Sequence, residues 1–172
     1  MSVLSFSSFG DPDFQRKGRK MMFFQTAALV LLLLALGHVE TSGDVIAFNT
    51  YITKTLHLQE GTLADVVYDG LYYNHGNAYN QQTGVFTAPS NGLYVFTWSS
   101  CVAAGKIFDV ELLLNGKRTG LGNCNNVGGK GYANCSNTFP LVLKAGDKVN
   151  IRTTKHADYL HQDFSSFSGW KV

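Results

Sequence analysis

The sequence predicts an all-β protein with the two layered sheets of a sandwich or jelly roll, preceded by a signal peptide. Three observations support this fold class. Short segments of alternating side chains recur after residue 43, and turn dipeptides such as Asn91-Gly92 and Asn115-Gly116 separate them. No amphipathic helix of useful length follows residue 38. An aromatic content of 13% and 18 glycines suit a packed, turn-rich β protein.

The first 37 residues are predicted to be a polar, basic arm followed by the signal peptide. The basic run RKGRK at residues 16–20 precedes an unbroken apolar run from Ala27 to Leu36. A basic flank, an apolar stretch and then small residues are typical of a secretory signal, with cleavage expected near Gly37. The run is shorter than the ~20 apolar residues of a membrane span. We therefore expect a secreted, extracellular protein with no membrane attachment after cleavage. The alternative is a type II signal-anchor whose basic flank stays in the cytosol.

Residues 38–43 are expected to be a short polar linker, and residues 44–172 the globular domain. The first strand is predicted in the β-branched and aromatic run 44–53, and two short strands around an Asp69-Gly70 turn follow in 63–73. Residues 107–120 are predicted to form a hairpin, and residues 138–154 two strands around a turn at 145–147. The stretches 121–137 and 155–163 are predicted loops, and residues 164–172 close the sheet.

The stretch 74–98 is the best-defined part of the domain. Thr83-Gly84 and Asn91-Gly92 mark turns, and the side chains alternate after the second turn. Tyr94, Phe96 and Trp98 then share one face of a strand. Three rings on one face are more than a solvent-facing strand carries, so this face is predicted to be core or a subunit interface.

These residues resemble the globular head of the complement C1q family. The resemblance covers about residues 44–172, and it includes a tail at 167–172 that resembles the closing strand and a turn at 143–149. Its ring and turn positions are Tyr68, Asn74, Tyr79, Phe86, Gly92, Tyr94, Phe96, Trp98, Phe167 and Gly169.

The resemblance implies a C1q/TNF-like jelly roll, a homotrimer, and a lectin-like role in innate immunity with microbial glycans or other surface ligands as partners. Because residues 38–43 hold no Gly-X-Y repeat, we expect a head without a collagen stalk. The alternative is a TNF-like cytokine that binds a cell-surface receptor, with an uncleaved anchor giving its topology. A structural or matrix component is a third candidate.

Three cysteines in an exported domain allow one disulfide and leave one thiol over. We favour Cys124–Cys135, because these residues flank a Gly- and Asn-rich stretch that could bring them within bridging distance. A bridge from Cys101 to either of the others, or three reduced thiols, are the alternatives. Asn134-Cys135-Ser136 is a sequon for N-glycosylation at Asn134, and a bridged Cys135 is expected to hinder its use.

A polar-ligand surface is predicted in the segment 155–163. Tyr159 could stack on a sugar, while Asp158, His161 and Asp163 offer hydrogen bonds. A solvated loop without a ligand is the alternative interpretation. His156 and His161 with these carboxylates do not match a metal motif, and no metal site is predicted.

Composition and motifs exclude several functions. The first 37 residues hold four of the 14 basic and two of the 12 acidic residues, so the remaining domain is formally neutral. Such a domain lacks the clustered charge that nucleic-acid binding needs. No catalytic motif is present, and we do not expect an enzyme or a cofactor. C1q-like trimers can hold calcium through carboxylates between the hairpin after Leu114 and the strand at Thr138. This chain has only amides and carbonyls there, so no calcium site is expected.

Overall fold

The computed structural model describes residues 45–59 and 61–172. The predicted signal peptide at 1–37 and the linker at 38–43 lie outside these residues. The described part folds into strands: β1 Ala47–Tyr51, β2 Leu56–His57, β3 Gly70–His75, β4 Tyr79–Asn80, β5 Val85–Thr87, β6 Gly92–Ala103, β7 Phe108–Leu114, β8 Lys117–Gly122, β9 Tyr132–Leu143, β10 Lys148–Ala157, β11 Tyr159–Leu160 and β12 Ser166–Lys171. It contains no helix that could cross a membrane.

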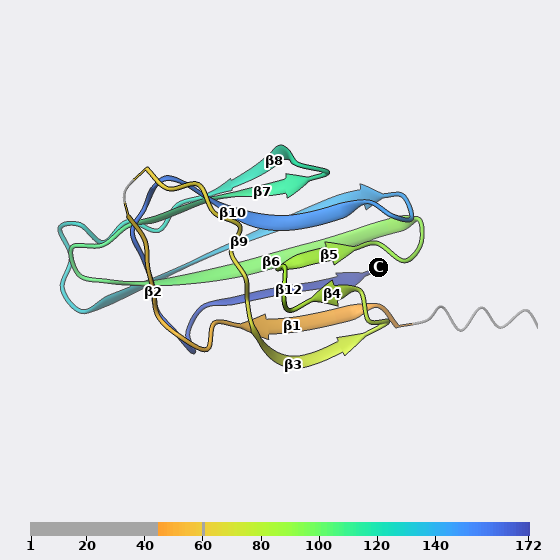
Figure 1. Ribbon diagram of the computed structural model, residues 1–172, viewed down its shortest axis with the longest axis horizontal. Coiled ribbons are helices and arrows are strands. Elements are labelled where there is room, and N and C mark those ends of the chain that lie inside the picture. The colour runs from red at the N-terminus through yellow and green to blue at the C-terminus, as the bar shows by residue number, and fades with distance from the viewer. Residues whose placement is uncertain (1–44, 60) are drawn as a thin grey trace, which may run out of the picture. The chain divides into compact units, whose positions relative to one another are not determined.

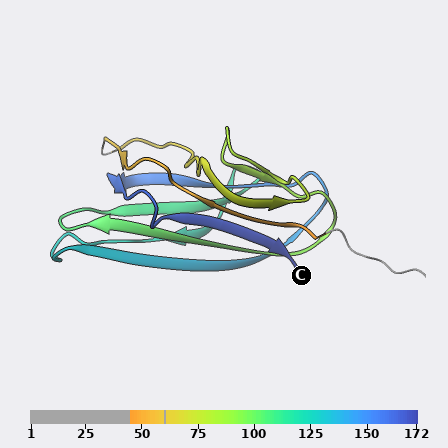
Figure 2. The same ribbon diagram turned by 90° about the horizontal axis from the view of Figure 1, so that it is seen from below.

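The strands form the two-layered sandwich that the sequence predicts, in a jelly-roll arrangement. One five-stranded sheet has the order β3-β1-β12-β6-β9, which we call the first sheet, and the second has the order β4-β5-β10-β7-β8. A small pair, β11 with β2, lies beside them. Figure 1 shows the long strands running side by side, and Figure 2 shows the two layers edge-on. Strands β1 and β12 are antiparallel neighbours, so the start and the end of the domain lie together.

The core forms because alternate residues of each strand face the other sheet. In β6, Tyr94, Phe96 and Trp98 are at most 1% exposed. Phe48 of β1 stacks against Tyr79, with ring centroids 4.8 Å apart. The core position of the β6 rings resolves the choice that the sequence left open between core and interface.

Gly169 makes this ring packing possible. A Cβ atom at this position would lie 2.6 Å from the Phe48 ring and 2.7 Å from the Phe96 ring. Real Cβ atoms do not approach aromatic carbons so closely, so the two rings occupy the space that a side chain would need. The absence of a side chain in the middle of β12 therefore serves close packing, as glycine within strands often does.

Asn74 and Tyr79 hold the turn between β3 and β4. The Asn74 side-chain amide donates to the Tyr79 carbonyl at 2.8 Å and accepts from the Tyr79 N–H at 3.2 Å. The Tyr79 hydroxyl in turn donates to the Tyr68 carbonyl at 3.3 Å and accepts from the Tyr68 N–H at 3.2 Å. Three of the residues that carry the family resemblance thus form one hydrogen-bonded unit.

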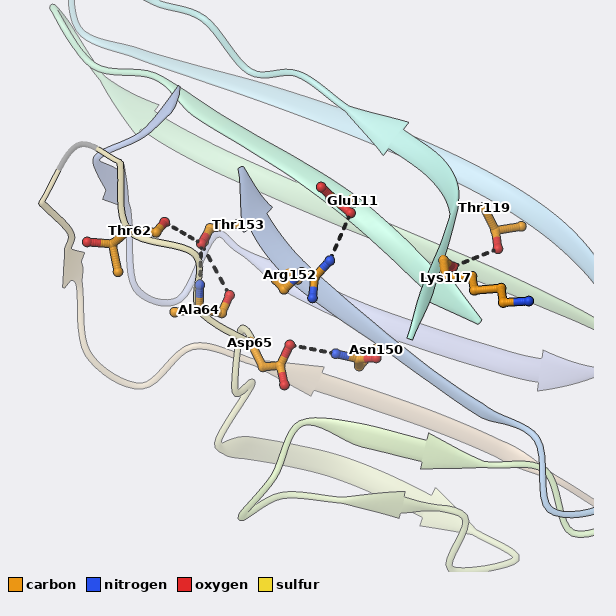
Figure 3. A network of polar contacts seen from close by, with 9 residues as sticks. All are labelled: Thr62, Ala64, Asp65, Glu111, Lys117, Thr119, Asn150, Arg152 and Thr153. Atoms are coloured by element: carbon orange, nitrogen blue, oxygen red, sulfur yellow. Dashed lines mark hydrogen bonds and ion pairs between the residues drawn. The ribbon is translucent and has the colours of Figure 1, made fainter. Parts of the chain in front are cut away.

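The outer surface of the second sheet is polar. Arg152 of β10 donates to Glu111 of β7 at 3.3 Å. The segment 62–66 runs antiparallel beside β10, where Thr153 Oγ1 accepts from the Ala64 N–H at 2.8 Å and Asn150 donates to Asp65 at 2.8 Å (Figure 3). These contacts pair several polar groups of this sheet within the chain itself, whereas Arg152 Nε is buried without a hydrogen-bond partner among the described residues.

Three local predictions were wrong. Residues 132–137 form the first half of β9 rather than a loop, and most of 155–160 belongs to β10 and β11. Asp69-Gly70 is not a turn between two strands, because Gly70 is the first residue of β3. The Asp69 carboxylate instead accepts hydrogen bonds from Thr53, through its N–H at 3.0 Å and through its hydroxyl.

Candidate functional site

The outer face of the first sheet carries a continuous row of apolar and aromatic side chains. In antiparallel pairs, residues opposite one another point to the same face. The register places one residue from each strand in a single row, which we call the apolar row: His75, Ala47, Trp170, Val95 and Pro140.

Next to this row, Leu93 of β6 lies opposite Val142 of β9 on the same face. Trp170 is 42% exposed, Leu93 41% and Val142 80%. A contiguous apolar surface of this kind on a folded chain is typical of a surface that another molecule covers. On the outer face of the second sheet, the exposed side chain of Leu121 lies opposite Glu111, which forms an ion pair with Arg152.

The face becomes polar along the strands. The next row contains Asn49, Ser168, Thr97 and Thr138, with the partly exposed ring of Tyr73 at its β3 end. Ser168 donates to Asn49 at 2.9 Å, and Thr138 donates to Thr97 at 3.1 Å. The outer face therefore has an apolar end, where the domain begins and finishes, and a polar end beyond it.

Of the predicted ligand residues, Asp158 is largely occupied by contacts within the chain. Its carboxylate accepts from the Ile107 N–H at 2.9 Å and from the Lys106 ammonium at 3.2 Å. Tyr159 is only 9% exposed, and its ring packs edge-on against His57 at 5.4 Å. A ring so deeply buried offers little surface to a sugar.

Asp163 is the most accessible of the four residues, and His161 is half-buried, as Asp158 is. Asp163 is exposed and adopts a positive φ of 63°. His161 is half-buried between two aromatic rings, with its centroid 4.8 Å from that of Tyr132 and 5.6 Å from that of Phe164. The structure thus brings Tyr159 and His161 together, with centroids 6.3 Å apart, and turns Asp158 toward Lys106.

Comparison with known proteins identifies the family. The model of the C1q domain matches residues 47–172. The chain belongs to the C1q domain family. The zebrafish (Danio rerio) protein Caprin-2 is 29% identical over 119 residues, which cover 68% of this chain. The chain spans only 13% of the length of that protein, so the similarity concerns one part of it.

Solved structures support the fold of this C1q domain. The globular domain of zebrafish complement 1qA superposes with a TM-score of 0.59 at 18% identity, covering 74% of this chain and 97% of that one. Murine APRIL superposes with a TM-score of 0.55 at 13% identity, covering 74% and 99%. At these identities the likeness establishes the shared jelly roll and no more.

The favoured disulfide of this C1q domain is present. Cys124 and Cys135 are bonded, with Cα atoms 5.4 Å apart, and the bridge links the segment after β8 to the edge strand β9. Cys101 is unpaired and buried. Burial raises the pKa of the Cys101 thiol, so it stays protonated and weakly nucleophilic at neutral pH.

Sequence reasoning missed two exposed rings at the polar end of the first sheet. Tyr132 is 62% exposed and Phe164 63% exposed, and both lie beside His161. The alternation of Tyr132, Asn134 and Ser136 was the available signal, but the surrounding glycines and asparagines concealed it. Within the described residues, no group of His, Cys, Asp or Glu side chains comes together as a metal site.

Proposed function

We propose that this C1q-domain protein is secreted, assembles as a homotrimer through the outer face of its first sheet, and binds surface ligands without catalysing a reaction. The family resemblance implies microbial glycans as the ligand class and a lectin-like role in innate immunity. The observation that carries the proposal is the apolar row with Leu93 and Val142 beside it, because an isolated chain would leave this surface in water.

A trimer fits the distribution of polarity. Stable interfaces bury about 800 Å² per partner and have an apolar centre with a polar rim. The apolar end of the first sheet supplies such a centre, and the row through Asn49 and Thr97 supplies the rim. The ion pair on the second sheet leaves that side to solvent. Three copies would present three identical sets of loops to one surface, so weak contacts add up to useful avidity.

Ligand contacts are proposed at the predicted residues Asp158, Tyr159, His161 and Asp163. We rank their expected contributions to ligand binding by how accessible their side chains are. Asp163 is exposed and His161 is half-buried with its Nδ1 hydrogen-bonded to the Gln162 carbonyl, whereas Asp158 is paired with Lys106 and Tyr159 is packed on His57. A glycan would therefore contact His161 and Asp163 first. A His161→Ala/Asp163→Ala variant should lose binding on a glycan array while a Lys155→Ala control keeps it, and equal binding by both would remove this site.

A cytokine-like ligand for a cell-surface receptor is the second candidate. The superposition with murine APRIL supports it at the level of the fold. The two functions differ in the fate of the N-terminal apolar run. N-terminal sequencing of material from the culture medium should find a start near residue 38 for the secreted recognition protein. Retention of residues 1–37 on a membrane-bound product would favour the cytokine-like alternative.

The assembly is tested by one charged substitution and its matched control. Val142→Asp places a charge on the exposed apolar end of β9, while Leu121→Asp places one at a 55% exposed position of β8 in the second sheet. Because burying an unpaired charge costs several kcal/mol, Val142→Asp should convert the trimer to single chains. The Leu121→Asp variant should still have the mass of three chains in sedimentation equilibrium. A wild-type mass of one chain, or an equal effect of the two substitutions, would refute the assembly face.

A further inference from the structure

We propose that Asn134 carries an N-linked glycan whose first sugar lies on the exposed rings of Tyr132 and Phe164. This inference rests on the proposed export of the chain, because N-glycosylation takes place in the secretory pathway. Three features of the structure carry it: the orientation of Asn134, the state of its side-chain nitrogen, and the two rings beside it.

The orientation of Asn134 places its side chain on the opposite side of β9 from the disulfide. Asn134 and Ser136 are both exposed on the outer face of β9, which is the edge strand of the first sheet. Cys135 lies between them in sequence and therefore points to the other face. Its bridge to Cys124 is consequently on the side of β9 away from the Asn134 amide. The expected hindrance from the bridged Cys135 does not apply to a glycan on the folded strand.

The side-chain nitrogen of Asn134 has a hydrogen to spare. Nδ2 donates one hydrogen to the Phe164 carbonyl at 3.2 Å. In the transfer, Nδ2 forms a bond to C1 of the sugar, and the bond from C1 to the diphosphate of a lipid-linked oligosaccharide breaks. The proton displaced from Nδ2 leaves with the diphosphate. The second hydrogen remains on Nδ2, so the hydrogen bond to Phe164 can persist in the glycosylated chain.

The two rings form a platform for the attached sugar. Tyr132 precedes Asn134 by two residues on one strand, so both side chains project from the same face. Phe164 reaches the same place from the segment before β12, held by the Asn134 hydrogen bond to its carbonyl. Both rings are more than 60% exposed, and the imidazole of His161 lies between them and contacts each. The apolar face of a sugar stacked on them would remove that surface from water.

The glycan and the assembly face share a sheet without overlapping. Asn134 and Val142 are eight residues apart on β9, which corresponds to about 26 Å along a strand. A glycan at Asn134 would thus mark the polar end of the outer face and leave the apolar end open. Removing the glycan should leave the assembled mass of the protein moiety unchanged.

The test uses the full chain in mammalian cells, expressed once from its own start and once behind a heterologous secretion signal. Intact mass is measured before and after treatment with peptide N-glycosidase, for the wild type and for Ser136→Ala, which removes the sequon but keeps Asn134. We expect the wild type to lose an N-glycan and the variant to carry none. Secreted protein without a glycan on Asn134 would overturn the site.

The role of the rings is measured by combining Ser136→Ala with Tyr132→Ala, and in parallel with Tyr73→Ala as a matched exposed tyrosine of the first sheet. In the background that keeps Tyr132, loss of the glycan should raise the unfolding equilibrium constant roughly five- to tenfold, as expected for one stacked ring. In the Tyr132→Ala background this difference should vanish, and in the Tyr73→Ala background it should persist. A difference that survives Tyr132→Ala would overturn the platform.

The two expression routes separate this inference from the proposed export. A chain that stays in the cell without a glycan when it uses its own start, but is glycosylated at Asn134 behind the heterologous signal, would refute export and support the site. A chain that is secreted by both routes and lacks the glycan would refute the site and support export.

Discussion

The Cys124–Cys135 bridge should make a large contribution to the stability of the domain. The two cysteines are 11 residues apart, so the bridge closes a short loop that contains the turn before β9. Chain-entropy estimates for such a loop give about 3 kcal/mol, mainly by restricting the unfolded chain. Cys124 is also 1% exposed and belongs to the core, so its truncation removes buried contacts as well. We expect Cys124→Ala/Cys135→Ala to lower the free energy of unfolding by about 3–4 kcal/mol.

This loss is measured by urea unfolding at one fixed protein concentration, because assembly makes apparent stability depend on concentration. Cys101→Ala is the matched control, since it removes a buried thiol that forms no bridge. It should cost about 1 kcal/mol and leave the dependence on urea unchanged. A loss below about 1 kcal/mol in the double variant, or an equal loss in the control, would contradict the assigned role of the bridge.

Two further predictions concern the core. Burial raises the pKa of Tyr79 to about 12. The unfolded chain therefore ionises this tyrosine first, near pH 10, and the stability present below that pH is lost as the pH rises toward 12. Tyr79→Phe should lower the free energy of unfolding by about 1–2 kcal/mol at pH 7, because the hydrogen bonds from its hydroxyl to the Tyr68 backbone are lost. The variant should also show a smaller fall in melting temperature between pH 10 and pH 12 than the wild type. An equal fall in both proteins would refute this. Gly169→Ala, which forces a methyl group against Phe48 and Phe96, should lower the free energy of unfolding by about 2 kcal/mol or more, measured by thermal unfolding. An unchanged melting temperature would show that the two rings can move to make room for the methyl group.

The sequence predicted the sandwich well where one face of a strand is apolar. Alternation of Tyr94, Phe96 and Trp98 with smaller residues identifies β6, because only a strand places every second side chain in the core. Asn74 and Tyr79 were placed by family resemblance. Their hydrogen bonds explain why an amide and a tyrosine are useful at these two positions.

The sequence did not predict the strand that forms through backbone pairing without an apolar pattern of its own. Residues 132–137 are small and polar and follow a glycine-rich stretch, so no apolar period marks them. They form a strand because the whole length of β6 pairs with β9, from Ala103 opposite Tyr132 to Gly92 opposite Leu143. A partner strand 29 to 39 residues away in sequence cannot be inferred from local propensity.

The apolar row was hidden for a related reason. Val95 and Trp170 lie in different parts of the sequence, and each alone is an ordinary exposed apolar residue. Only the register of β6 with β12 brings them side by side. The burial of Tyr159 was equally invisible, because its pairing with His57 depends on the contact between β11 and β2.

Acrylamide quenching of tryptophan fluorescence tests the assembly face most directly. The chain has two tryptophans, of which Trp98 is 1% exposed in the core and Trp170 is 42% exposed in the apolar row. At high protein concentration both should resist quenching, and dilution through dissociation should expose Trp170 as the mass falls from three chains to one. A Trp170 that is equally accessible at every concentration, in an assembly that keeps its mass, would show that this face is not where the copies meet.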